Sequence, residues 1–411
     1  MTSTSPPAPA SRPDLGLLLI LGALTAFAPM SIDMYLPALP GIASDLGSTA
    51  TGAQATVAAF FVGLSAGQLL YGPLSDRRGR RGPLLFGVAL YVAASALCVV
   101  APTMTTLIVA RVLQALGGCA GVVIARAVVR DRFDHADSAR IFSTLMLIMG
   151  VAPILAPLVG GAVMTHLGWR AIFGLLAAFG ALVGLAVALG LPESRTEATL
   201  VRARSESPLR AYLALLAQPR LLAYVLTGGL SSAAMFTYIT ASPDLVIGTY
   251  GVPATSFGWV FGLNAAGIIG ASQLNRLLLR WLSPDRILRL TTAGAALAAA
   301  VLFATAQLGT LGLTGILVPL FFVIAAGDGV GAGEAAGALA QDPHRSGTVS
   351  ALLGATQFGL GAAGAGLAGV LHDGTARPMA SLIAACVAAS VIAARRATQA
   401  PAKVAPGAPI A

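Results

Sequence analysis

The chain has 411 residues, of which 56% are hydrophobic and only 10% are charged. This composition, with a mean hydropathy of +0.83, excludes a soluble protein, because a water-facing surface needs a much larger share of charged residues. The net charge of +9 does not indicate nucleic-acid binding, since the basic residues lie in short connections between long apolar runs. The sequence therefore predicts an integral membrane protein, with the lipid bilayer as its solvent.

Apolar runs of about 20 residues, the length with which a helix crosses a bilayer, follow one another along the whole chain. We expect an all-α membrane protein with twelve spanning helices, at 15–37, 52–74, 83–101, 105–128, 141–165, 170–191, 220–242, 255–279, 288–307, 312–338, 347–371 and 377–394. They form an N-terminal six-helix bundle at 15–192 and a C-terminal six-helix bundle at 220–396, with a linker at 193–219 and tails at 1–14 and 397–411. Two similar halves around one linker are typical of transporters whose halves rock about a central site.

The arginines indicate how the chain is oriented in the membrane. They cluster in the connections after the second, fourth and eighth spans, whereas the connections after the first, third, seventh and ninth contain no lysine or arginine. Positively charged loops stay in the cytoplasm, so we expect both termini and the linker to be cytoplasmic and the protein to lie in the cell membrane. The first apolar run is too long for a signal-peptide core, so the N-terminal tail should stay attached.

The connection after the second span reads GPLSDRRGRRG from Gly72. Its glycines permit sharp turns, and Asp76 precedes Arg80 by four residues, a spacing that favours an ion pair. A loop that only kept positive charge in the cytoplasm would need neither feature. The connection resembles the signature loop of the major facilitator superfamily, which implies the major facilitator fold.

In that superfamily the loop acts as a cytoplasmic latch that controls conformational switching and does not bind the cargo. The resemblance implies that Asp76 contacts Arg80 and the N-terminal end of the span at 347–371, and that Asp131 is a further partner. The expected latch residues are Gly72, Asp76, Arg77, Gly79, Arg80 and Asp131.

The span at 105–128 carries Arg111, and a charged residue inside a membrane needs a partner or a polar cavity. The residues around it resemble the pattern of the superfamily's fourth span, which implies a role for Arg111 in proton coupling. Because Arg111 lies near the start of the span, the alternative is a side chain that reaches the outer interface.

Glycines and prolines are spaced along the span at 141–165, where prolines bend a helix and glycines let neighbouring backbones approach. This segment resembles the antiporter motif of drug and proton exchangers, which implies export and not uptake. Ala156 stands where the pattern usually has glycine, and a kinked packing helix is the alternative. The motif residues are Gly150, Pro153, Pro157, Gly160 and Gly161.

Two acids in apolar surroundings are candidate proton carriers, because intramembrane carboxylates commonly mark proton pathways. Asp33 ends the first span, where protonation and drug binding could compete, and its alternative is an acid at the outer mouth. Glu334 lies with Asp328 in the span at 312–338, where these acids could bind a cationic drug or a second proton. The alternative for Glu334 is a hydrated position near the cytoplasmic end. The proton-coupling candidates are therefore Asp33, Arg111 and Glu334.

Further stretches resemble the bicyclomycin and chloramphenicol resistance branch of the superfamily's drug exporters. They are DMYLPALP from Asp33, ARAVVRD from Ala125, WRAIF from Trp169, Ser242-Pro243, and GTVSALL from Gly347. The resemblance implies proton-coupled antiport of small, largely apolar drugs such as chloramphenicol or bicyclomycin, by alternating access. The alternative is a superfamily transporter of a sugar or another metabolite.

A drug cavity should be apolar with a few polar groups, and methionine and aromatic side chains adapt to varied cargo. We expect it to be lined by Met30, Met34, Tyr35, Gln114, Met235, Phe236, Tyr238 and Asn264. The sequence has no GxxxxGK[ST] motif and its histidines are scattered, which disfavours an ATP-driven pump and a membrane enzyme. It thus predicts a non-enzymatic, monomeric exporter of a small drug in exchange for protons, without a cofactor or a metal.

Overall fold

The structure is a computed structural model that describes residues 15–133, 135–205, 207–309 and 311–399. Within these ranges it contains helices and their connections and no strand, which confirms the predicted all-α fold. The elements are α1 (Leu15–Asp33), η1 (Leu36–Ala38), α2 (Leu39–Asp45), α3 (Ala50–Arg78), α4 (Arg81–Val99), α5 (Met104–Arg132), α6 (His135–Leu167), α7 (Trp169–Gly190), α8 (Glu197–Ser205), α9 (Pro208–Leu216), α10 (Pro219–Pro243), η2 (Asp244–Thr249), α11 (Ala254–Leu278), α12 (Pro284–Leu308), α13 (Gly312–Gln341), η3 (Pro343–Arg345), α14 (Ser346–Val370) and α15 (Arg377–Gln399).

Twelve helical segments of the described chain are long and apolar enough to cross a membrane, in agreement with the predicted twelve spans. The first combines α1, η1 and α2, and the seventh combines α10 and η2. Several helices are longer than predicted: α6 begins at His135 and not at 141, and α13 ends at Gln341 and not at 338. An apolar run marks only the part of a helix inside the bilayer, whereas the backbone hydrogen bonds continue into polar residues.

The connection predicted as a linker carries two short helices, α8 and α9. Pro208 opens α9, where its missing N–H costs no helical hydrogen bond. The hydroxyl of Tyr212 in α9 donates to the carbonyl of Leu69 in α3 (3.3 Å), and α9 also packs against α10 and α14, so the linker touches both halves of the chain. The predicted tail at 1–14 and residues 400–411 of the predicted tail at 397–411 lie outside the described residues, whereas 397–399 belong to α15. The division into two bundles at the stated bounds stays a prediction.

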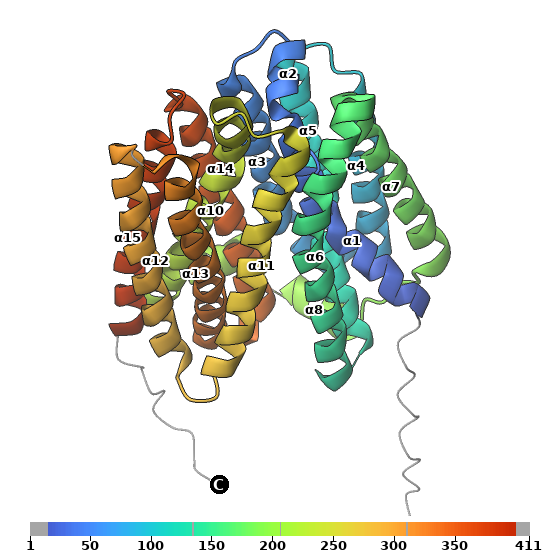
Figure 1. Cartoon of the computed structure of the whole chain (residues 1–411). Coiled ribbons are helices and arrows are strands. Elements are labelled where there is room, and N and C mark those ends of the chain that lie inside the picture. The colour runs from blue at the N-terminus through green and yellow to red at the C-terminus, as the bar shows by residue number, and fades with distance from the viewer. Residues whose placement is uncertain (1–14, 134, 206, 310, 400–411) are drawn as a thin grey trace, which may run out of the picture.

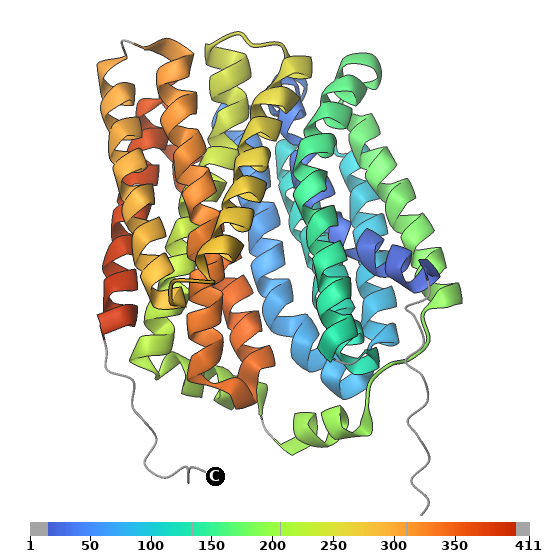
Figure 2. The same cartoon turned by 60° about the horizontal axis from the view of Figure 1, so that its bottom comes forward.

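The spanning helices pack in two groups, each built mainly from one half of the sequence (Figures 1 and 2). In the first half, α5 packs against α3 and α4, and α4 packs against α7. In the second, α10 packs against α13, α14 and α15, while α12 packs against α13 and α15. The halves meet along a seam of two helix pairs, α3 with α14 and α6 with α11.

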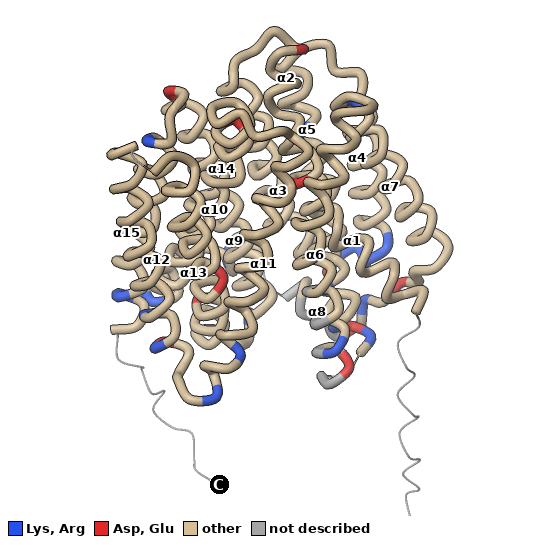
Figure 3. Tube along the Cα trace, viewed as in Figure 1, with Lys and Arg blue, Asp and Glu red and all other residues tan. Residues whose placement is uncertain are grey.

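The two ends of the molecule differ in charge, because most arginines gather at one of them (Figure 3). We call this the arginine-rich end; it is defined by the loops that join α3 to α4, α5 to α6 and α11 to α12. Helix α1 begins and α15 ends on this side (Figure 1). The opposite end is defined by the loops that join α2 to α3 and α4 to α5.

The pair α3 and α14 is tied together from the opposite end towards the middle of the seam. The hydroxyl of Thr51 donates to the carbonyl of Gly369 (2.8 Å), and the hydroxyl of Ser65 donates to the carbonyl of Ala355 (2.8 Å). These bonds join side chain to backbone and therefore need close approach of the two helices.

The pair α6 and α11 is also packed at the opposite end. A Cβ added at Gly161 would stand 2.9 Å from the carbonyl oxygen of Ala254, whereas one added at Gly150, nearer the arginine-rich end, would meet no atom closer than 3.6 Å. Further in that direction, Gly72 of α3 and Gly347 of α14 have open space where a side chain would begin. The seam is therefore closed at the opposite end and parts towards the arginine-rich end, as the lower ends of α6 and α11 show in Figure 1.

Candidate functional site

Asp33 is the last residue of α1 and lies where the closed part of the seam begins. It is only 4% exposed, and its carboxyl makes no hydrogen bond or ion pair with another described residue. It is therefore not exposed to solvent in this conformation, while its role as a proton carrier and the alternative of an acid at the outer mouth stay predictions. A buried carboxyl without a fixed cation is suited to exchanging a proton, because no permanent partner competes for it.

Asp33 faces a polar pair from the other half of the chain. The side-chain amide of Asn264 in α11 donates to the hydroxyl of Tyr238 in α10 (2.8 Å), and the Asp33 carboxyl acts electrostatically on that hydroxyl. All three residues are buried. The structure therefore brings together three predicted site residues from three helices, with the acid on one side of the seam and the amide and phenol on the other.

Arg111 lies wholly inside the first half, so the alternative of a side chain that reaches the interface is wrong. Its guanidinium stands over the rings of Tyr35 (4.6 Å) and Phe60 (4.1 Å), and its Nη1 donates to Gln114 Oε1 (2.6 Å). The Gln114 amide is oriented in turn by the Ser95 hydroxyl, which it reaches at 2.8 Å. Aromatic faces partly compensate the buried charge, but Nε and Nη2 have no partner. Arg111 thus keeps two unused donors and no carboxylate among the described residues.

Glu334 is fully buried in the second half, so the predicted alternative of a hydrated acid is wrong for this conformation. Its Oε1 accepts from the amide of Gln357 in α14 (2.6 Å), whereas Oε2 has no hydrogen-bond partner. A Cβ at Gly228 of α10 would collide with the carboxyl group, so glycine is what makes room for the acid. Asp328, on the same helix, is only half-buried. Asp33, Arg111 and Glu334 form no common cluster, since no ion pair joins any two of them.

The predicted cavity-lining residues do not surround one cavity in this conformation. Phe236 belongs to an aromatic cluster across the seam, with ring centroids 4.1 Å from Phe61 and 5.6 Å from Phe358. Met235 lines a cavity within the second half. The remaining candidates pack beside Asp33 or Arg111: Met30, Met34, Tyr35, Gln114, Tyr238 and Asn264. Their role in binding stays a prediction.

The glycines of the predicted antiporter motif lie in different surroundings along α6. Gly160 is in contact with the turn that follows α1, and a Cβ there would collide with the backbone of Met34, next to Asp33. Pro153 and Pro157 lie inside the helix, and Gly161 faces α11 as described above. The motif therefore packs α6 against both halves beside the candidate proton site.

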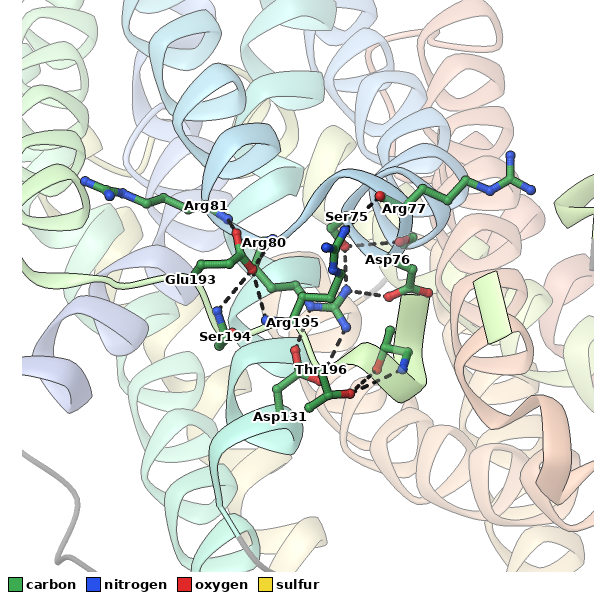
Figure 4. A network of polar contacts seen from close by, with 12 residues as sticks. Ser75, Asp76, Arg77, Arg80, Arg81, Asp131, Glu193, Ser194, Arg195 and Thr196 are labelled. Atoms are coloured by element: carbon green, nitrogen blue, oxygen red, sulfur yellow. Dashed lines mark hydrogen bonds and ion pairs between the residues drawn. The ribbon is translucent and has the colours of Figure 1, made fainter. Parts of the chain in front are cut away.

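The latch residues meet at the arginine-rich end (Figure 4). Arg80 is in ion-pair contact with Asp76 and, through Nε, with Asp131 (2.7 Å), and its Nη1 also donates to the Ser75 hydroxyl (2.8 Å). Burial alone would lower the pKa of Arg80, but the two carboxylates outweigh it and raise that pKa. Gly79 has a φ of 95°, a left-handed conformation that favours glycine, and it turns the chain between α3 and α4. A contact between Asp76 and α14 stays a prediction.

Glu193, the first residue of the predicted linker, belongs to the same network (Figure 4). Its carboxylate accepts from the backbone N–H groups of Arg80 (2.8 Å) and Arg81 (3.2 Å) at the start of α4, and from those of Ser194 and Arg195. Partial burial would raise the pKa of Glu193, but these four donors outweigh it and hold that pKa below its usual value. An acid is favoured at a helix N-terminus, but nothing in the spacing shows which helix it meets.

Arginines complete the contact between linker and latch. Arg195 donates to the carbonyl of Arg77 at the end of α3 (2.8 Å), and Arg77 donates to the carbonyl of Ala203 in α8 (3.1 Å). The first part of the linker, from Glu193 to Ala203, is therefore bound to the α3–α4 turn, so a movement of this turn is transmitted to the chain that joins the two halves.

Replacing Asp131 by asparagine is expected to destabilise the protein more than the same replacement of Asp76. The Asp131 side chain is 9% exposed and that of Asp76 40% exposed. Loss of a buried charged hydrogen-bond partner costs about 1–3 kcal/mol, and loss of a solvent-screened ion pair about 0–1 kcal/mol. Thermal unfolding of the two purified variants in one detergent measures the difference. An equal or larger effect of Asp76→Asn would show that the buried pair does not hold the latch.

Replacing Glu193 by alanine is expected to free the linker, so that trypsin cleaves the 193–219 segment several times faster. Because the folded pKa of Glu193 is lowered, docking is fully favoured above its unfolded value of about 4.3 and is lost as the pH falls through the folded pKa. Docking should therefore persist throughout the neutral range and fail only in acid. Glu197→Ala removes an exposed acid from the same segment and serves as the control. Equal cleavage of both variants would contradict the assigned contact.

The buried ionisable groups, the two packed halves and the twelve spans define a multi-pass membrane transporter. The sequence profile of the Major Facilitator Superfamily matches residues 21–366. The chain belongs to this superfamily, and it is a transporter and not an enzyme.

Its relatives include proteins named for drug resistance. It is 34% identical over 377 residues (91% of this chain and 93% of the relative) to an MFS-type transporter of Bacillus subtilis, YdgK. It is 31% identical over 376 residues (92% and 94%) to the bicyclomycin resistance protein homolog of Haemophilus influenzae. It is 33% identical over 346 residues (82% and 79%) to a chloramphenicol resistance protein of Pseudomonas aeruginosa. The resemblance to the drug-resistance branch is confirmed.

Among solved structures, a D-xylose-proton symporter matches 92% of this chain and 96% of its own with a TM-score of 0.69. The partially occluded inward open conformation of the xylose transporter XylE from E. coli matches with a TM-score of 0.68. Both are 14% identical to this chain. They share the major facilitator fold, and at this identity they say nothing about the cargo.

Proposed function

We propose that this transporter exports small, largely apolar drugs, such as chloramphenicol or bicyclomycin, in exchange for protons. The observation that carries the proposal is the buried carboxyl of Asp33, without a cationic partner, beside the seam of a chain whose relatives are named for resistance to these drugs. The sugar transporters with the same fold do not favour the alternative of a sugar cargo, because the likeness is confined to the fold.

The mechanism would be alternating access across the cell membrane. The positive-inside rule places the arginine-rich end, both termini and the linker in the cytoplasm. The seam, closed at the opposite end, then corresponds to an inward-facing conformation that takes up drug from the cytoplasm or the inner leaflet. A proton from outside would bind Asp33 once the opposite end opens, and the drug would leave on that side.

Arg111 and Glu334 would complete the proton-coupling set. The two unused donors of Arg111 can pair with a carboxylate or a drug oxygen in another conformation, because buried donors without a partner are costly. Glu334 is linked through Gln357 to α14, a helix of the seam. Its protonation would therefore change the packing of α14 where the halves meet. The protein would work as a monomer.

A resistance panel in a drug-sensitive bacterial host tests this proposal. Expression should raise the inhibitory concentration of chloramphenicol or bicyclomycin, and an uncoupler that collapses the proton gradient should remove the drug export measured in the same cells. Unchanged susceptibility to the whole panel, cationic dyes included, or export that survives the uncoupler would reject proton-coupled drug efflux. Uptake of a radiolabelled sugar, with no effect on drugs, would favour the alternative.

A further inference from the structure

A cavity lies within the second half, away from the seam, between α10, α12, α13 and α15. Its volume is about 50 Å³, which is enough to hold water molecules. Small and apolar residues form most of its wall, but four hydroxyl groups also border it, those of Ser231, Ser232, Thr292 and Ser390. Packed helices in lipid leave few such spaces, and each polar group inside a membrane needs a partner.

Two of these hydroxyls have no partner in the protein and can hydrogen-bond to a molecule inside the cavity. Thr292 donates to the carbonyl of Leu288 (2.7 Å) and Ser390 to that of Thr227 (2.8 Å), so both are satisfied by backbone. Ser231 and Ser232 are half-buried, and neither has a hydrogen-bond partner among the described residues. Two adjacent serines without partners at this depth indicate that water occupies the cavity.

The cavity reaches residues next to Glu334 but not its carboxyl group, which is fully buried. Gly228 and Gly331 line it; Gly331 lies one turn before Glu334 on α13, and Gly228 is the residue whose missing side chain makes room for the Glu334 carboxyl. Oxygen Oε2 of Glu334 is fully buried and has no hydrogen-bond partner, whereas Oε1 is held by Gln357. The acid is therefore fixed to α14 through one oxygen and free at the other.

The groups that face Glu334 leave it without a cation. Helix α10 contributes Gly228 and, one turn away, Tyr224, whose hydroxyl donates to Asp285 of α12 (2.7 Å). Arg220 of α10 lies 3.8 Å from Asp285, so it is already paired with an acid. Helix α14 contributes the neutral Gln357, and α13 itself carries Asp328, a further acid.

We propose that this cavity is a hydrated proton-access pocket that serves Glu334 separately from the seam at which Asp33 lies. Water bound to Ser231 and Ser232 carries protons to the free oxygen of Glu334, and the state of Glu334 is passed to α14 through Gln357. This inference rests on the proposed proton coupling, but access of protons to Glu334 can be measured without any drug.

Infrared spectroscopy of the full-length protein in lipid tests the proposal. The carboxyl band of Glu334 is assigned by its loss in Glu334→Gln, and its hydrogen–deuterium exchange is followed after transfer to acidic D₂O. Ala295→Leu fills the cavity from α12, where Ala295 is a buried wall residue. Ala293→Leu places the same side chain on the exposed face of α12 and is the matched control.

We expect exchange at Glu334 to slow on the order of tenfold or more in Ala295→Leu and to match the wild type in Ala293→Leu. Ser232→Ala, which removes the hydroxyl and adds no bulk, should also slow it and replaces Ala295→Leu if that variant does not fold. Wild-type exchange rates in both cavity variants, or the absence of a Glu334 carboxyl band in acid, would overturn the proposal. Failure of the drug-resistance panel would leave these rates unchanged, so the two proposals fail separately.

Discussion

Replacing Asp33 by asparagine is expected to abolish drug-driven proton release from vesicles that contain the purified protein. Asparagine has nearly the same shape as aspartic acid but has no proton to exchange at any working pH, and the site is buried and lacks an ion pair that the change would break. Fold and drug binding should therefore survive while coupling is lost. Exchange of labelled for unlabelled drug without a proton gradient should persist, because it needs only alternating access.

Asp45→Asn is the matched control for this experiment. Asp45 ends α2 at the opposite end, is exposed, and pairs with Arg170 (2.5 Å) and with the indole N–H of Trp169 (3.0 Å). Its removal changes an exposed ion pair, which contributes little to stability, and should leave proton release intact. If Asp33→Asn released protons with drug as the wild type does, the assignment of Asp33 would be refuted and Glu334 would become the first candidate.

Replacing Gly160 by alanine is expected to reduce both thermal stability and transport severely. The added methyl group would collide with the backbone of Met34, which cannot move aside as a flexible side chain does. Overpacking of this kind costs about 1–3 kcal/mol, and it acts on the contact that closes the opposite end next to Asp33. The conformation described here would lose population to the outward-open one, about tenfold for each 1.4 kcal/mol.

Gly150→Ala is the matched control, because it replaces a glycine of the same motif that makes no close contact with another helix. Its Cβ would meet only Ile269 at 3.6 Å, an ordinary van der Waals contact, so stability and efflux should stay close to wild type. The two variants are compared by thermal unfolding and by efflux rates from loaded vesicles. Equal damage from both would mean that the motif acts through the flexibility of α6 and not through close approach to Met34.

The twelve spans could be predicted because the bilayer imposes one rule on every segment: the backbone must satisfy its hydrogen bonds internally and the side chains must be apolar. That rule acts locally, so it is readable from a window of the sequence. The ends of α6 and α13 were missed for the same reason, since a helix does not stop where its apolar residues do. The two helices of the linker lie outside the bilayer, where the rule does not apply.

Some contacts of the latch could be predicted from residues close in sequence, whereas others could not. The contact between Asp76 and Arg80 follows from a spacing of four residues across the turn between α3 and α4, and the family resemblance implied Asp131. Glu193 was not recognised, although its carboxylate accepts four backbone N–H groups, two of them more than a hundred residues earlier in the chain. Backbone donors are the same in every residue, so no sequence pattern marks them.

From the sequence alone one can predict that this protein spans the membrane twelve times, that its arginines gather at one end, and that Asp33, Arg111 and Glu334 are ionisable groups inside the membrane. The packing of the helices shows that Arg111 is enclosed by aromatic rings, that Asp33 faces Tyr238 across the seam, and that Glu334 keeps one free oxygen next to a cavity. Hydrophobicity and charge are properties of single residues, whereas burial, partners and cavities depend on helices that are distant in the chain and adjacent in space.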